Sequence, residues 1–174
     1  MERHFPPAST SSRLVAESGV AMVEMALVLP LLLVLLMGML DFGRAINYWN
    51  DVNHIAGEGA RFAAVNNNPG VDDPTPEPDF RKWLIKQAET GELVNGSESV
   101  VKQLEVCVSY PNGAPKVGDP VKVEAKAEFG LLPIVDEDDG PTVISINGSA
   151  TMRLEVVPPD PADGIPAGCE TATS

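Results

Sequence analysis

The sequence predicts an α+β protein in which a long N-terminal transmembrane helix is followed by a small domain, with a short helix packed on a three-stranded antiparallel meander. Three observations predict this class. An apolar run from Val20 to Leu40 is long enough to cross a membrane. A proline-rich segment then ends the helical pattern, and the second half of the chain alternates apolar and polar residues with the period of a half-buried sheet. The chain therefore reads as an anchor followed by one modest domain.

The first segment is a polar leader, residues 1–19. It contains two prolines and shows no apolar period, so we expect residues 1–18 to lack regular structure. The apolar stretch that follows is longer than the core of a secretory signal peptide, which has roughly 7 to 15 residues. Gly19 therefore marks the boundary between the leader and a membrane segment.

The membrane segment carries one ionisable side chain, Glu24. At 1.5 Å per residue the run covers roughly 30 Å, the thickness of the hydrocarbon core. A carboxylate inside it costs about 2.5 to 3.5 kcal/mol, which favours a partner for Glu24, although a side chain so near the start of the run can also reach the headgroups alone. Pro30 removes the hydrogen bond to the carbonyl of Ala26, a change that membrane helices tolerate where neighbours cover the freed group. Both residues favour packing against other helices.

The charge of the chain limits its partners and its orientation. The formal net charge is -13 at pH 7, which repels phosphate, so we expect no nucleic acid partner. Arg3 and Arg13 precede the span and favour a cytoplasmic N-terminus, with the C-terminal domain outside the cytoplasm.

The helical pattern continues beyond the span. Apolar residues recur every three to four positions from Phe42 to Phe62, as on one face of a helix, so residues 20–65 are expected to form one transmembrane and extended helix. Residues 66–79 contain four prolines and one glycine and are expected to form a linker.

The α+β domain is expected over residues 80–157. Asp79 can cap a short amphipathic helix at 80–90, with Gly91 just past its end. Three alternating segments follow, separated by turns at 111–119 and 136–141, and predict a meander whose apolar face the helix covers. The residues of the third strand expected to face inward are Ile144, Ile146, Ala150, Met152, Leu154 and Val156.

Two cysteines, Cys107 and Cys169, are an even number in a domain expected outside the cytoplasm. One disulfide is the favoured interpretation, and two unpaired thiols are the alternative. The alternation places Cys107 on the face opposite Val106 and Val108, away from the core. The proline-rich tail, residues 158–174, can return to this face and be held over the sheet by the disulfide.

Catalytic motifs are absent from the sequence. It has no Gly-rich phosphate loop and no Gly-x-Ser-x-Gly elbow, and its two histidines, His4 and His54, form no metal-binding pattern. The acidic turn at 136–140 does not have the spacing of a calcium-binding loop and is expected to be solvated. We therefore expect no enzymatic activity, no cofactor and no metal.

The segment from Gly19 to Val65 resembles the N-terminal region of TadE-like proteins, which are minor pilins or pseudopilins of the bacterial tight-adherence (Tad, or Flp-type) pilus system. The features that carry the resemblance are Gly19 four residues before the Val23-Glu24 pair, the run from Ala26 to Pro30, Asp41-Phe42-Gly43-Arg44 after the span, and Glu58-Gly59-Ala60-Arg61.

The resemblance implies that a prepilin peptidase cuts after Gly19 and leaves Val20 as the new N-terminus. The new α-amine is largely protonated at neutral pH, so Glu24 can pair with the amine of its own chain or of a neighbouring subunit. Met25 stands where many such cleavage motifs have an aromatic residue, and Glu17 and Ser18 stand where they have basic ones. A Tad component that keeps its N-terminal segment uncleaved is the alternative.

The implied function is structural, in the assembly or priming of a Tad-type adhesion pilus. The implied partners are the membrane, other pilin or pseudopilin subunits, prepilin peptidase and the Tad secretion platform proteins. The expected location is the bacterial inner membrane, in a single pass with the C-terminal domain outside the cytoplasm, or the pilus itself. The alternative is a single-span, membrane-tethered binding module that never enters a pilus, which would tolerate Glu24→Leu.

Overall fold

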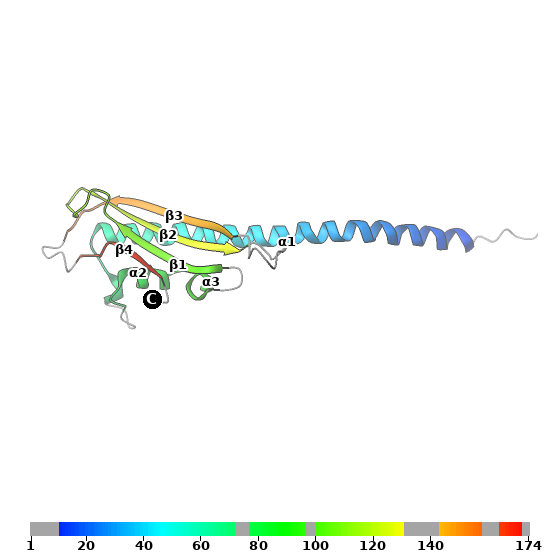
Figure 1. Cartoon of the computed structure of the whole chain (residues 1–174), viewed down its shortest axis with the longest axis horizontal. Coiled ribbons are helices and arrows are strands. Elements are labelled where there is room, and N and C mark those ends of the chain that lie inside the picture. The colour runs from blue at the N-terminus through cyan, green and yellow to red at the C-terminus, as the bar shows by residue number, and fades with distance from the viewer. Residues whose placement is uncertain (1–10, 72–76, 97–99, 131–142, 158–163, 172–174) are drawn as a thin grey trace, which may run out of the picture. The chain divides into compact units, whose positions relative to one another are not determined.

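The computed structural model describes residues 11–71, 77–96, 100–130, 143–157 and 164–171. They form two compact units, Met1–Leu40 and Asp41–Ser174, each of which is described by itself. The α+β class is confirmed (Figure 1). In chain order the elements are α1 (Ser11–Ala64), the 3-10 helix η1 (Pro69–Val71), α2 (Phe80–Lys86), α3 (Gly91–Asn95), β1 (Val100–Ser109), β2 (Pro120–Gly130), β3 (Val143–Arg153) and β4 (Gly168–Thr171).

The N-terminal unit is the first part of α1. The helix begins at Ser11, earlier than the expected start at Val20, because residues 11–18 contain no proline or glycine to stop it. The remainder of the leader, residues 1–10, lies outside the described residues. Pro30 lies inside α1, and the helix continues past it.

The C-terminal unit contains an antiparallel sheet with strand order β3-β2-β1-β4. The predicted meander of β1, β2 and β3 is confirmed, with Val106 opposite Ala125 and Val123 opposite Ala150. The predicted strand count of three is wrong by one, because β4 adds a fourth strand next to β1. The predicted turn at 136–141 lies outside the described residues.

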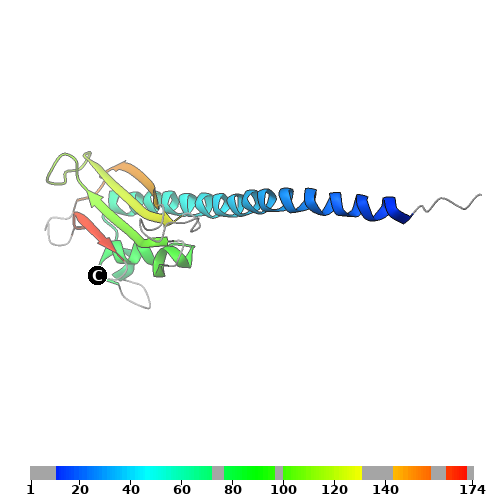
Figure 2. The same cartoon turned by 45° about the vertical axis from the view of Figure 1, so that its right-hand side comes forward.

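The helices cover one face of this sheet. Figures 1 and 2 show the domain part of α1 running behind β2 and β3, while α2 and α3 lie beside β1. The sheet residues that face the helices are buried, as the alternation predicts. They are Leu104, Val106, Val108, Val121, Val123, Ala125, Ala127 and Phe129.

The helix predicted at 80–90 is shorter than expected, and a second helix follows it. The Asp79 carboxylate accepts a hydrogen bond from the backbone N–H of Arg81 and caps α2, as predicted. The helix ends at Lys86, and Gly91 begins α3 instead of following the end of one longer helix. The physical reason is a tertiary contact, because the Asp51 carboxylate in α1 accepts the backbone N–H groups of the two residues that precede Gly91.

The third strand is less buried than its pattern predicts. Ile146 and Leu154 are buried and Ala150 is partly buried, but Ile144, Met152 and Val156 are exposed. β3 is an edge strand that ends at Arg153. Close contact with α1 is made at Gly148, in the middle of the strand, so its ends remain uncovered.

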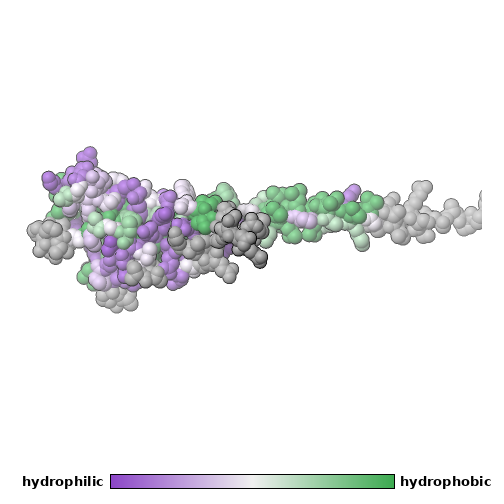
Figure 3. Space-filling model, in the orientation of Figure 1, coloured by the Kyte–Doolittle hydropathy of each residue, from purple (hydrophilic) through white to green (hydrophobic). Residues whose placement is uncertain are grey.

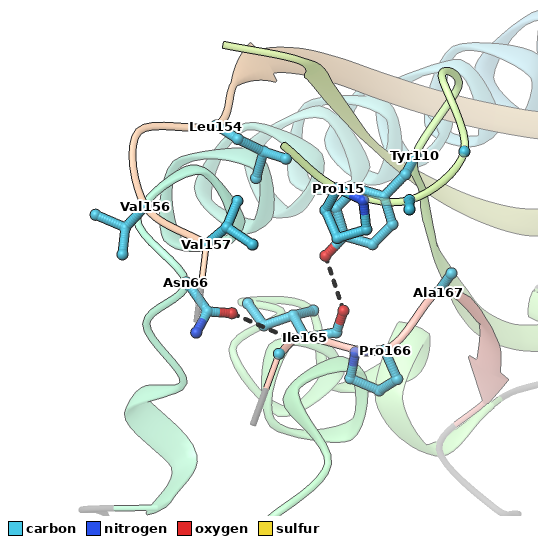
Figure 4. A pocket seen from close by; sticks show the side chains of 12 residues that line it. Asn66, Tyr110, Pro115, Leu154, Val156, Val157, Ile165, Pro166 and Ala167 are labelled. Carbon is cyan, nitrogen blue, oxygen red and sulfur yellow. Dashed lines mark hydrogen bonds between the residues drawn. The ribbon is translucent and has the colours of Figure 1, made fainter. Parts of the chain in front are cut away.

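The tail adds to the edge of the sheet, whereas the sequence predicts that it lies over the sheet. Cys169 is opposite Cys107 in the β1–β4 ladder. Before β4, the backbone N–H of Ile165 donates to the Asn66 side chain at 3.1 Å, and the Tyr110 hydroxyl donates to the Ile165 carbonyl at 2.8 Å (Figure 4). These two bonds satisfy the backbone N–H and carbonyl of Ile165.

Candidate anchoring and assembly helix

The N-terminal part of α1 has the properties of a membrane span. From Gly19 onward the described residues hold one helix that is long and apolar enough to cross a membrane, judged by its length and composition. Every residue from Gly19 to Leu40 is exposed, and nearly all of them are apolar. Such a surface in water would be unfavourable, so its apolar side chains require lipid or other helices.

The residues that the sequence identifies as candidates in this unit all lie on the surface of the helix. Gly19, Val20, Glu24 and Pro30 are all exposed on α1. A Cβ atom at Gly19 would meet no described atom within 4 Å outside its own helix turn. Val20 and Glu24 are four positions apart and so lie on the same face of the helix.

The next part of α1, Asp41–Ala64, is packed into the C-terminal unit. Its buried side chains are mostly small, and a Cβ atom at Gly59 would lie 2.5 Å from Leu84 Cδ2 and 3.0 Å from Val123 Cγ1. The helix therefore approaches α2 and β2 closely. The apolar residues of this part that are buried are Tyr48, Val52, Ile55, Ala56, Ala60, Ala63 and Ala64.

Two aromatic contacts fix the ends of this packing. The rings of Tyr48 and Phe129 have centroids 5.4 Å apart, and the rings of Phe62 and Trp83 meet edge to face at 5.5 Å. They join α1 to the end of β2 and to α2. The helix α1 is thus held to β2 at one end of the contact and to α2 at the other.

A polar cluster ties α1 to α3. The Tyr48 hydroxyl donates to Glu92, and the Arg44 guanidinium lies 3.4 Å from the same carboxylate. The Asp51 carboxylate, itself buried, accepts the N–H of Glu89 at 3.2 Å and that of Thr90 at 2.8 Å. This cluster is not predictable from the sequence, because its partners lie about forty positions apart and leave no local pattern.

The two cysteines form a disulfide between β1 and β4. Their Cα atoms are 3.9 Å apart, and 62 positions separate them in the sequence. Cys107 lies on the face opposite the buried Val106 and Val108, as the alternation predicts. Glu105 lies close to both sulfur atoms, but the sulfurs are bonded to each other and offer no thiolate to a metal.

A hollow lies at the other end of the sheet from the polar cluster. This pocket of about 380 Å³ is lined mainly by apolar groups, including Pro115, Leu154 and Ile165 (Figure 4). Tyr110 is its one ionisable lining residue, and burial raises the pKa of the Tyr110 hydroxyl. Among the described residues, this lining holds no pair of an acid and a base.

Residues 19–61 match the family model described as TadE-like protein. The match covers about a quarter of the chain and confirms the resemblance on which the interpretation of α1 rests. No curated protein matches the chain, and no solved structure matches it. The matched segment begins at Gly19, runs through the whole exposed part of α1 and ends within the part that is buried in the domain.

Proposed function

We propose that this chain, whose TadE-like segment is the long helix α1, is a minor pilin or pseudopilin that serves as a structural component in the assembly or priming of a Tad-type adhesion pilus. One observation carries the proposal. The TadE-like match covers two stretches with different environments: residues 41–61 belong to the domain and include many buried side chains, whereas residues 19–40 are all exposed. An apolar surface with no partner in its own chain suits a subunit that packs against lipid before assembly and against other subunits afterwards.

The chemistry of the helix start supports processing by a prepilin peptidase. Gly19 is exposed on α1, and a Cβ atom there would meet no described atom within 4 Å. Cleavage creates an ammonium group at Val20, one helical turn from the Glu24 carboxylate. Glu24 then gains an opposite charge within its own chain or in a neighbouring subunit, which offsets the cost of holding a carboxylate in the membrane.

The proposed role is not enzymatic. The hollow next to Tyr110 lacks an acid and base pair, and the two cysteines are joined to each other. The proposed location is the bacterial inner membrane in a single pass, with the disulfide-bonded domain outside the cytoplasm, where such a bond persists.

The mass of the N-terminal peptide tests the proposal. The full chain is extracted from membranes with and without a co-expressed prepilin peptidase. We expect a start at Val20 only with the peptidase. Gly19→Val is the matched variant, because nothing near Gly19 would clash with a side chain, and it is expected to block cleavage without changing the fold. An uncut chain in the presence of a peptidase that cuts a known substrate would contradict processing.

Pilus formation tests the assembly role of Glu24. Glu24→Gln keeps the size of the side chain and removes its charge. Glu24→Leu also removes the ability of the side chain to form hydrogen bonds. Both are expected to reduce surface pili at least tenfold while the protein remains in the membrane. Met25→Leu, on the neighbouring exposed position, is the control and should assemble normally.

The alternative function is a tethered binding module, and the apolar pocket beside Tyr110 and Ile165 is the observation that favours it. A tether needs only an apolar span, so Glu24→Leu should leave ligand binding by such a module unchanged. If filling the pocket, for example by Ala167→Trp, also abolishes ligand binding, the two results together would favour the module over the pilin.

A further inference from the structure

An exposed apolar surface lies on the C-terminal unit, at the end of the sheet where β3 begins. Three α1 side chains at helical spacing form it, with exposed fractions of 68% at Phe42, 43% at Ile46 and 55% at Trp49. Ile144 of β3 continues it, and Figure 3 shows hydrophobic surface near the start of β3. A groove of about 410 Å³ runs along this surface and has no ionisable residue in its lining. We call these four residues the stripe.

The pocket beside Tyr110 lies at the opposite end of the same sheet. The β2–β3 ladder begins next to the stripe, where Gly130 pairs with Val143, and ends at Arg153. The next residue, Leu154, lines the pocket. The strand β3 has 11 residues, so the two ends of the ladder are roughly 33 Å apart. Stripe and pocket both belong to the C-terminal unit, so their separation does not depend on the placement of the N-terminal unit.

We propose that the stripe of one copy docks against the Tyr110 pocket of a second copy, with the Trp49 indole as the inserted group. The inference goes beyond the proposed function, because the contact lies within the C-terminal unit and requires neither processing nor a pilus. The two surfaces differ, so each copy offers its stripe to one neighbour and its pocket to another. Such a head-to-tail contact continues as an open row of copies unless its rotation closes a ring.

The size and chemistry of the pocket suit one indole ring. Its volume of about 380 Å³ is near the lower end of the range for ligand sites, roughly 300 to 1,000 Å³, so it suits a single large side chain. An indole also brings one N–H donor that needs an acceptor. The Ile165 carbonyl in the lining accepts one hydrogen bond, from the Tyr110 hydroxyl at 2.8 Å, and has a second lone pair (Figure 4). Phe42 has no donor for it, which favours Trp49 as the inserted residue.

The area of the contact indicates weak association. The four half-exposed side chains of the stripe can bury on the order of 100 Å² each. Both copies together then bury roughly 800 Å², which is less than the 1,200 to 2,000 Å² of stable complexes. We therefore expect a monomer in dilute solution and association at high concentration.

The charge of the chain opposes the contact at long range only. The formal net charge of -13 makes two copies repel each other. Neither the groove nor the pocket has a charged side chain in its lining, and Arg44 next to the stripe is paired with Glu92. Repulsion between charges farther apart than about 10 Å is screened in 0.1 M salt. Added salt should therefore strengthen an apolar contact, whereas it would weaken one between opposite charges.

Sedimentation equilibrium of the full chain in density-matched detergent micelles tests the contact. The stripe variant is Trp49→Ala, and the pocket variant is Ala167→Trp, which places an indole at an exposed position of the lining. Val117→Ala is the matched control, because this exposed valine belongs to neither surface. We expect the average mass of the unaltered chain to rise with concentration beyond that of a dimer. Each of the two variants should lower the association constant at least tenfold, and the control should change it less than twofold.

A mixture of the two variants identifies a head-to-tail contact. Trp49→Ala keeps an intact pocket and Ala167→Trp keeps an intact stripe, so an equimolar mixture should regain association and stop at the dimer. A mixture that stays monomeric, or an unaltered chain that stops at a dimer, would overturn the proposal. Association that weakens at least twofold from 0.1 to 0.5 M salt would also overturn it.

Cross-linking gives a second readout that does not depend on the pocket variant. Benzoylphenylalanine replaces Trp49, and chains labelled with ¹⁵N are mixed with unlabelled chains. We expect photo-cross-links from one chain to residues 164–167 of another, and cross-links only to detergent or within one chain would overturn the proposal. If Ala167→Trp unfolds the domain, Val156→Trp, at another exposed position of the lining, replaces it.

The two proposals fail separately. The contact is measured on the uncleaved chain in micelles, so a chain that associates as expected but is never cut or assembled loses only the proposed function. A chain that is processed and assembled, but whose Trp49→Ala variant associates like the unaltered protein, loses only this contact.

Discussion

The carbonyl oxygen of Val52 in α1 lies only 2.7 Å from the position that a Cβ atom on Gly148 of β3 would take. Helix and strand therefore meet at this point through their backbones. The contact brings Val52 and Ile55 onto the sheet, where both are fully buried.

Gly148→Ala is expected to lower the free energy of unfolding by about 3 kcal/mol, because neither backbone can move aside without disturbing its neighbours. Urea unfolding of the full chain in detergent micelles measures the loss. Gly57→Ala is the control, since a Cβ atom there meets nothing within 4 Å and alanine favours helix by up to about 1 kcal/mol. Gly59→Ala should fall between the two, because the Leu84 side chain it meets can rotate. Equal effects at the three positions would contradict the close contact at Gly148.

Loss of the disulfide is expected to destabilise the domain by up to about 4 kcal/mol, the value that chain entropy gives for a loop of 62 residues. The variant that carries Cys107→Ala and Cys169→Ala should melt at a lower temperature than the oxidised protein. Adding a reductant should lower the melting temperature of the unaltered chain and leave that of the variant where it is. A reductant effect on the variant would mean that the change does not come from this bond.

Asp51→Ala is expected to cost about 2 kcal/mol, because it leaves two backbone N–H groups before α3 without their acceptor. Amide hydrogen exchange should speed up at Glu89 and Thr90 more than elsewhere in the domain. Asn50→Ala, at the exposed neighbouring position, should change the free energy of unfolding by less than about 0.5 kcal/mol. Similar effects of the two substitutions would show that Asp51 does not hold α3.

Acid should remove the contribution of Asp79. The hydrogen bond from the Arg81 side chain lowers the pKa of the Asp79 carboxyl below its ordinary value of 3.8. The ionised form therefore stabilises the fold above that ordinary pKa, and the contribution is lost as the pH falls through the lower folded value. Asp79→Asn keeps the helix cap and cannot ionise, so the stability difference between the two proteins, about 1 kcal/mol, should be constant from pH 5 to 8 and shrink below about pH 4. A difference that does not depend on pH would exclude the charge as its cause.

Local sequence patterns correctly predicted the elements that are determined by residues close together in the chain. The alternation in β1 and β2 identified their buried face, and the Asp79 cap identified the start of α2. β4 has only four residues after a proline-rich stretch, too short for a pattern to be read. The break between α2 and α3 depends on Asp51, about forty positions earlier, and a single sequence does not show that contact.

The residues of the candidate site also fall into two groups, those that a local pattern identifies and those that it does not. Glu24 stands out because it is the one ionisable residue in an apolar run, whereas the cleavage expected between Gly19 and Val20 came only from the resemblance to TadE-like proteins. The exposure of Ile144 was not predicted, because this residue has the pattern of a core residue. It is exposed because α1 crosses β3 at Gly148 and leaves the start of the strand uncovered.

The pairing of β1 with β4 sets an order of events during synthesis. β2 follows β1 directly in the chain, but the strand that completes the other side of β1 begins only at Gly168. During vectorial emergence of the chain, one row of β1 peptide groups therefore remains unpaired while some sixty further residues are made. The nascent domain presents an open strand edge throughout that interval, which makes it a substrate for a holding chaperone and for premature pairing with another nascent copy.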